Sequence, residues 1–160
     1  MPAFSTQMIG QTEKALNALL DRLLAGTGIT EPQWVTLTLT VVSEGTLSAD
    51  ALAERVAHSL KVDQATVHRL LAELTAAGLI RATQEGTVEP TEHGKAEWTR
   101  VRAAITDVTG RLWGDLPPED LAAAGRVLDT VLARANTLLS AAPHPGAERS
   151  HATSDGTVTA

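Results

Sequence analysis

The chain has 160 residues, a formal net charge of -6 and 43% hydrophobic residues, enough apolar content to bury one core. It contains no cysteine, which excludes disulfides and thiolate metal sites. No apolar stretch is long enough to span a membrane, and the first ten residues lack the basic and apolar segments of a signal peptide. We therefore expect a cytoplasmic protein with no membrane partner.

Residues 7–25 form the first expected helix, because their leucines recur at helical spacing. Residues 31–43 fit two structures. Their apolar residues alternate with threonines as in a strand, whereas Thr30 and Gln33 form a capping box that would start a helix. We predict a helix, since it would complete the three-helix core that a helix-turn-helix needs.

Residues 47–80 have the pattern of two helices joined by a tight turn. Ser48 is a good N-cap, and an apolar stripe with a four-residue spacing follows it. Asp63 caps the second helix, which Gly78 ends. The polar face of that second helix carries Gln64, Thr66, His68 and Arg69. Such side chains donate to phosphates and base edges, as in a recognition helix, although the solvated face of an ordinary helical hairpin has the same appearance.

A short β-hairpin is expected directly after the second helix. Residues 81–84 and 87–89 fit two strands, with the turn signal Glu85-Gly86 between them. A helix-turn-helix followed by a hairpin is a winged helix. Because Glu85 makes the hairpin tip acidic, we predict that the tip adds little to DNA binding and that Arg81, at the base, contacts a phosphate.

Two long helices are expected after the hairpin. The first runs from about Thr91 to Trp113, and the second follows Pro117-Pro118, where proline and two acids suit a helix start. Between Leu121 and Leu138, apolar residues at alternating spacings of three and four form a lengthwise packing seam. Burial within the chain's own domain and dimerisation both fit this seam. Residues 141–160 have no periodicity and are expected to be disordered.

The order and spacing of these elements resemble the MarR family of bacterial transcription regulators. The similar segments, which together span about residues 7–140, are Thr30-Glu31-Pro32-Gln33-Trp34, Gly78-Leu79-Ile80-Arg81, Thr91-Glu92-His93-Gly94 and Leu116-Pro117-Pro118-Glu119-Asp120. One segment departs from the family, which usually carries Asp-x-Arg in a longer hairpin. Residues 81–90 contain no such motif.

The resemblance implies a mainly α fold with a small β-hairpin wing. The expected parts are an N-terminal dimerisation helix (1–29), a winged-helix DNA-binding lobe (30–92), C-terminal dimerisation helices (93–140) and the disordered tail (141–160). The implied function is a homodimeric transcription regulator that binds double-stranded DNA. Its two recognition helices would enter successive major grooves of a palindromic operator, about 34 Å apart. The resemblance also favours dimerisation for the seam of the last helix.

The expected DNA contacts are Lys61, Gln64, Thr66, His68, Arg69 and Arg81, with Arg55 and Lys95 as further candidates. The charge of the lobe argues against DNA binding, because residues 46–95 hold five Arg or Lys against seven Asp or Glu. Affinity would then come from local placement of the cations, which dimerisation doubles. The alternative is a degenerate winged-helix protein-interaction module that kept the dimer and lost DNA binding.

Two tryptophans have a second implied role. The resemblance implies that Trp34 and Trp98 line a crevice for a small aromatic ligand that relieves DNA binding, whereas packing in a core or interface is the simpler interpretation. No motif indicates catalysis, so we expect no enzyme activity. The histidines in or beside the lobe lack the i, i+4 spacing of a two-histidine metal site, so we expect neither a metal nor a cofactor.

Overall fold

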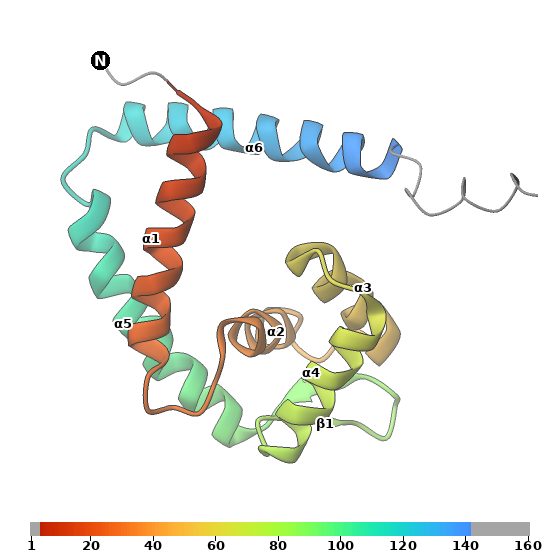
Figure 1. The fold of residues 1–160 in the computed structure, drawn as a ribbon. Helices are drawn as coiled ribbons and strands as arrows, with labels where there is room; N and C mark the ends of the chain where they lie inside the picture. The colour runs from red at the N-terminus through yellow and green to blue at the C-terminus, as the bar shows by residue number, and fades with distance from the viewer. Residues whose placement is uncertain (1–3, 142–160) are drawn as a thin grey trace, which may run out of the picture. The chain divides into compact units, whose positions relative to one another are not determined.

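The computed structural model describes residues 4–141 and confirms a mainly α fold with a small hairpin. Its elements are α1 (Thr6–Leu24), α2 (Glu31–Val42), α3 (Ala49–Leu60), α4 (Gln64–Ala76), β1 (Ile80–Ala82), β2 (Val88–Pro90), α5 (Glu92–Trp113) and α6 (Pro118–Ala141) (Figure 1). The chain divides into two compact units, one up to Leu112 and one from Trp113. The predicted disordered tail lies outside the described residues, except for Ala141, which ends α6.

The segment with the strand-like alternation is helix α2, as predicted. Both halves of its capping box form. The backbone amide of Gln33 donates to the Thr30 hydroxyl at 3.5 Å, and the backbone amide of Thr30 donates to the side-chain oxygen of Gln33 at 2.9 Å. Thr36 and Thr40 are fully buried, and each hydroxyl donates at 2.8 Å to the carbonyl four residues earlier. Because the helix itself satisfies these hydroxyls, threonines can face the core without an unpaired polar group.

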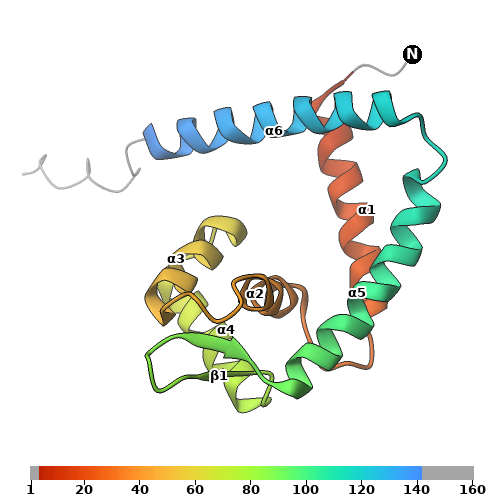
Figure 2. The ribbon, with the colours of Figure 1, turned by 180° about the vertical axis from the view of Figure 1, so that it is seen from behind.

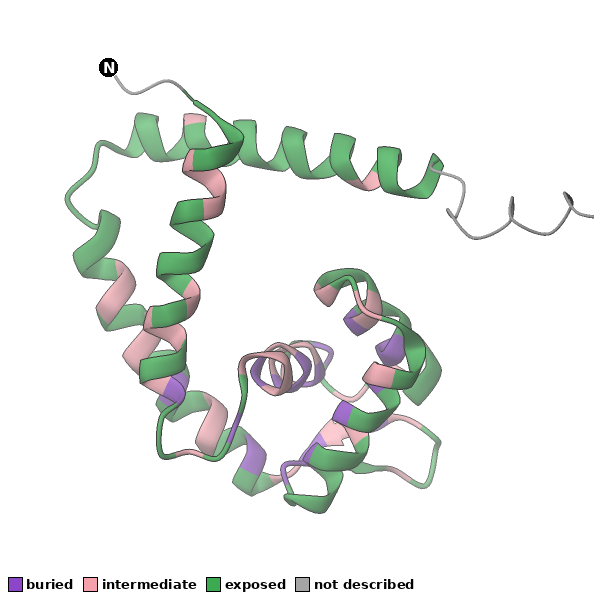
Figure 3. Ribbon diagram, in the orientation of Figure 1, coloured by how far each residue is buried: buried purple, intermediate pink, exposed green. Residues whose placement is uncertain are grey.

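Helix α2 lies at the centre of the first unit and contacts α1, α3, α4 and β2 (Figures 1 and 2). The buried faces of α2, α3 and α4 turn toward one another and form the core (Figure 3). Its largest fully buried apolar side chains are Leu37, Leu52, Val56, Val67, Leu74 and Val101. The three-helix core that motivated the prediction of α2 is therefore present.

The turn between α3 and α4 is built as the sequence predicts. The Ser48 side chain accepts from the amide of Ala51 at 3.2 Å and caps α3. Lys61 ends α3 in the left-handed conformation, with a φ of 57°. The carboxylate of Asp63 then accepts from the amide of Thr66 at 2.8 Å and caps α4.

The hairpin follows α4 directly, as predicted, but the predicted strand limits are wrong. The register pairs Ile80 with Pro90, Arg81 with Glu89 and Ala82 with Val88. Residues 83 and 84 lie outside β1, and the loop that they begin is closed by the amide of Thr83, which donates to the carbonyl of Thr87, and by a bond of 2.8 Å between the two hydroxyls. A bridge between Thr87 and Ser48 attaches the residue before β2 to the N-cap of α3.

The second unit is dominated by α6. Within the described part of the chain, no residue of α6 is buried, and Figure 3 shows the helix exposed along nearly its whole length. Its apolar residues Leu121, Val127, Leu128, Val131, Leu132, Leu138 and Leu139 are 37% to 71% exposed. No helix in residues 4–141 combines the length and hydropathy of a membrane span.

Candidate nucleic-acid interface

One face of α4 is free for contact with another molecule. Gln64, His68 and Arg69 are exposed in its first two turns, while Val67 and Leu70 on the opposite face are buried in the core. Thr66, also predicted as a DNA contact, is only half-exposed and bonds to Asp63 through its amide. The fold therefore places three of the four predicted polar side chains of this helix at the surface.

The entrance to α4 carries charges of both signs. Lys61 is exposed in the turn before the helix. The pKa of Asp63 lies below its usual range, mainly because the amide of Thr66 donates to the ionised carboxylate, with a smaller attraction from Arg69. A phosphate approaching the start of α4 would thus meet both a lysine and an ionised aspartate.

Three of the five cations in residues 46–95 are paired with carboxylates. Arg69 approaches Glu73 at 3.9 Å, Lys95 approaches Glu92 at 3.0 Å, and Arg81 contacts Glu89 through two nitrogens. All three cationic side chains are more than half exposed. Exposed pairs of this kind contribute only about 0–1 kcal/mol, so phosphates can replace the carboxylates.

The two remaining cations of this segment, Arg55 and Lys61, are exposed and take part in no ion pair within residues 4–141. Arg55 lies on α3 and Lys61 at its C-terminal end. The cations that can bind a phosphate without first breaking an ion pair therefore lie on α3 and in the turn after it. Those of α4 and the hairpin are already paired.

Arg81 is held against the neighbouring strand. Its Nη2 lies 2.7 Å from Oε1 of Glu89, and its Nε donates to the same oxygen at 2.8 Å. The two residues face each other in the antiparallel register, so β1 and β2 themselves place them in contact. Contact of Arg81 with a phosphate stays a prediction, and it requires the guanidinium to turn from this partner or to share it.

Gln33 and Glu73 belong to the same surface but were not predicted from the sequence. The side-chain amide of Gln33, on α2, donates to Oε2 of Glu73 on α4 at 2.8 Å. The i, i+4 spacing of Arg69 and Glu73 is visible in the sequence. The contact of Glu73 with Gln33, 40 residues away, depends on the packing of α2 against α4.

The predicted ligand-binding pair, Trp34 and Trp98, is brought together by the packing of the first unit. The two rings stack with centroids 6.4 Å apart, and Trp34 is only 6% exposed. The indole N–H of Trp98 donates to the hydroxyl of Thr38 at 3.1 Å. These contacts support the packing interpretation, while ligand binding at this pair stays a prediction.

No family model matches the chain, and no curated protein matches its sequence. Solved structures do match. The reduced form of MarR from E. coli is 20% identical, with a TM-score of 0.63 over 82% of this chain and 96% of that one. A MarR family protein of Mycobacterium tuberculosis in complex with DNA is 21% identical, with a TM-score of 0.62 over 81% and 98%.

A third structure, CouR from Rhodococcus jostii RHA1 bound to p-coumaroyl-CoA, is 16% identical, with a TM-score of 0.68 over 78% of this chain and 89% of that one. The chain has the MarR winged-helix fold. This confirms, at the level of fold, the resemblance drawn from the sequence. In this fold, α4 is the second helix of the helix-turn-helix, and the β1–β2 hairpin follows it directly.

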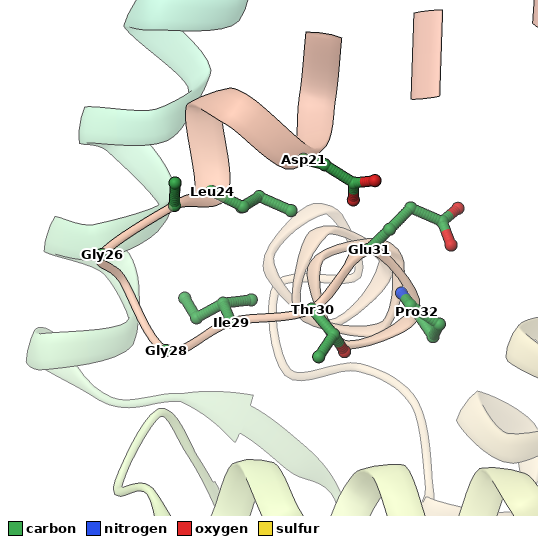
Figure 4. A pocket seen from close by; sticks show the side chains of 9 residues that line it. Asp21, Leu24, Gly26, Gly28, Ile29, Thr30, Glu31 and Pro32 are labelled. Carbon is green, nitrogen blue, oxygen red and sulfur yellow. The ribbon is translucent and has the colours of Figure 1, made fainter. Parts of the chain in front are cut away.

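A hollow opens where α1 meets α2 of the MarR fold, with a volume of about 620 Å³ (Figure 4). Apolar side chains such as Leu24 and Ile29 line it, together with the carboxylates of Asp21 and Glu31. Burial raises the pKa of Glu31, and the charge of Asp21 raises it further. Neither Trp34 nor Trp98 lines this hollow. Its negative charge makes it unsuited to phosphate.

Within residues 4–141, no group of three or more His, Asp or Glu side chains is arranged to hold a metal ion. His68 lies exposed on α4, and His58 is exposed on α3. The exposed side of α4 carries hydrogen-bonding side chains and a cation, with the carboxylates of Asp63 and Glu73 beside them.

Proposed function

We propose that the protein is a DNA-binding transcription regulator of the MarR type. The observation that carries the proposal is α4, which buries one face in the core and exposes Gln64, His68 and Arg69 on the other. A helix held in this way can enter a major groove, where amide and guanidinium groups read base edges. The similarity to a MarR family protein in complex with DNA supports the same function.

We further propose that it acts as a homodimer on a palindromic operator. The exposed apolar residues of α6 support this, because a face with leucines 37% to 71% exposed is stabilised by burial against a second copy. A dimer would also present two copies of α4 to half-sites about 34 Å apart. Because a dimer doubles the acidic residues as well as the cations, its gain in affinity would come from binding both half-sites at once.

Binding to DNA would exchange ion pairs inside the protein for ion pairs with phosphates. Arg81 and Lys95 each have a carboxylate partner in the free protein, and those carboxylates stay near the phosphates after the exchange. We therefore expect weaker non-specific binding than that of a basic winged helix. The sequence preference would then depend more strongly on contacts with bases.

Relief of DNA binding by a small aromatic ligand is also part of the proposal. One structure with the same fold, CouR, is bound to p-coumaroyl-CoA. Trp98 is half-buried beside Trp34, so a ligand that reached this pair would change the environment of an indole. Quenching of tryptophan fluorescence on titration with phenolic acids, lost in Trp98→Phe, would support this part of the proposal.

A second candidate function is a protein-interaction module that has lost DNA binding. The observation that favours it is the pairing of three of the five cations in residues 46–95 with carboxylates, together with the acidic hairpin tip at Glu85. A surface neutralised in this way is suited to a protein partner as well as to DNA.

Fluorescence anisotropy with labelled duplexes distinguishes the two functions. One duplex carries the DNA upstream of the protein's own gene, and a scrambled duplex of equal composition is its control. The regulator should prefer the upstream duplex and lose affinity as salt rises. Equal or absent binding to both duplexes at low salt would contradict the proposal and favour the interaction module.

A further inference from the structure

Gln33, Glu73 and Arg69 form a chain of contacts from α2 to the exposed face of α4. The Gln33 side-chain amide donates to Oε2 of Glu73 at 2.8 Å, and Oε1 of Glu73 lies 3.9 Å from Nε of Arg69. Each oxygen of the carboxylate thus faces a different partner. The outermost member of the chain, Arg69, has a side chain that is 68% exposed.

The inner end of this chain is fixed. The Gln33 oxygen accepts from the amide of Thr30 at 2.9 Å, as the second half of the α2 capping box. Because the backbone of Thr30 holds the oxygen of the Gln33 side chain, the NH2 group of the same side chain is oriented toward Glu73. Glu73 is consequently restrained from the side of α2, which is the central helix of the core.

The outer end leaves Arg69 able to read a base. Its closest approach to Glu73, 3.9 Å from Nε, is an ion-pair contact longer than a hydrogen bond, so the two terminal nitrogens of the guanidinium are available for a bidentate contact with guanine. A free arginine loses many rotamers when it is fixed against DNA. An arginine already restrained by Glu73 loses fewer, and the negative charge of Glu73 disfavours contacts with phosphates instead of bases.

We propose that Gln33 and Glu73 are positioning residues that hold Arg69 in the orientation for reading a base. This inference rests on the proposed DNA-binding function and goes beyond it, because it assigns part of the sequence preference to two residues that need not touch DNA. Removing the restraint should lower the ratio of specific to non-specific affinity while leaving the fold intact.

Gln33→Glu is the most informative single variant. Glutamate also serves in a capping box, so the start of α2 is kept, whereas the amide donor to Glu73 is replaced by a repelling carboxylate. We expect the affinity ratio for operator over scrambled duplex to fall about two- to tenfold, the effect of freeing one flexible side chain. An unchanged thermal midpoint would show that the variant folds.

Two further variants test whether the effect passes through the chain of contacts. In Q33E/E73Q the hydrogen bond can form with donor and acceptor exchanged, and the amide oxygen at position 73 can still accept from Arg69. We expect the double variant to regain part of the affinity ratio, because residue 73 is again held from α2 although the charge opposite Arg69 is lost. In the Arg69→Ala background, Gln33→Glu should leave the ratio unchanged, because no arginine remains to be positioned.

The restraint on Arg69 can also be measured without DNA. We expect ¹⁵N relaxation of the Arg69 Nε–H group to show greater mobility in Q33E and recovery in Q33E/E73Q. If the wild type prefers the operator and Q33E has the same affinity ratio for operator over scrambled duplex, this inference is wrong while the proposed function stands. No operator preference in the wild type would overturn both, and unchanged Nε–H mobility in Q33E would by itself disprove the restraint.

Discussion

Gly94 and Leu79 touch backbone to backbone, since a Cβ atom on Gly94 would overlap the main-chain carbonyl of Leu79. Thr91 fixes the same junction: its hydroxyl donates to the Gly78 carbonyl at 2.6 Å and accepts from the Gly94 amide at 2.9 Å. The backbone at Leu79 and the backbone at Gly94 thus pack directly against each other, with the Thr91 hydroxyl bonded on either side. This contact gives the Thr-x-x-Gly spacing a physical reason, because the threonine caps α5 and the glycine permits the approach.

Gly94→Ala should destabilise the fold by roughly 1–3 kcal/mol, because the added methyl group must displace backbone. Gly110→Ala is the matched control, since Gly110 lies on the same helix with open space around its Cα, and alanine there should stabilise by up to about 1 kcal/mol. Urea denaturation measures both changes. Equal effects at the two positions would show that the contact with Leu79 is unimportant.

Asp63→Asn should reduce the dependence of stability on pH. The pKa of Asp63 is lowered from 3.8 in the fold, so its ionised form contributes stability above pH 3.8 that is lost as the pH falls through the lower folded pKa. Asparagine keeps the N-cap but does not titrate in this range. The difference in unfolding free energy between wild type and variant, followed by urea denaturation from about pH 5 to about pH 2, should shrink toward acid. A constant difference would contradict this role.

Arg69→Ala should weaken operator binding by roughly 1–3 kcal/mol and relax the preference at one base pair. The exposed position of Arg69 predicts little change in the thermal midpoint. Anisotropy titrations against single-base operator variants measure the preference. An unchanged affinity for the operator would show that α4 does not bind in the groove.

Arg81→Ala should weaken binding about equally on all sequences and reduce the salt dependence, as expected for a phosphate contact. Glu89→Gln should have the opposite effect, because it releases Arg81 from the carboxylate 2.7 Å away. Glu85→Gln, at the tip, should leave binding unchanged or slightly tighter. If Arg81→Ala instead relaxed the preference at one position without altering the salt slope, Arg81 would be reading a base.

Truncation after Pro117 should give a monomer or an aggregate, since it removes the exposed apolar face of α6. Either product should lose cooperative binding to two half-sites. Light scattering and anisotropy test the two consequences. A truncated chain that stayed dimeric and still bound DNA would assign dimerisation to another surface.

The helix-turn-helix was predictable because its signals are local. Ser48, Asp63 and Gly78 are capping residues whose effect extends over a few positions, and the apolar stripes between them have a clear helical period. Helix α2 was harder, since its alternating threonines imitate a strand. The fold resolves this ambiguity through hydroxyls that bond to the preceding turn, which no count of apolar residues reveals.

Which cations are paired with carboxylates was not predictable from composition. Pairing of Arg81 with Glu89 depends on the hairpin register, and the predicted strand limits were off by one or two residues. The hydrogen bond between Gln33 and Glu73 depends on how α2 packs against α4. Both relationships join residues from different elements. The sequence therefore allows the charged residues of the lobe to be counted, but it does not show which of them are paired.

The attachment of the wing to α3 has a consequence for motion. The amide of Val88 donates to the carbonyl of Leu47 at 3.0 Å, and Thr87 bridges to Ser48, which caps α3. Opening of the hairpin would therefore also release the cap of α3, so the amides of Val88 and Ala51 should exchange their hydrogens with solvent in a single cooperative event. A force on the wing would therefore reach the start of α3 through these bonds, in addition to reaching the end of α4 through β1.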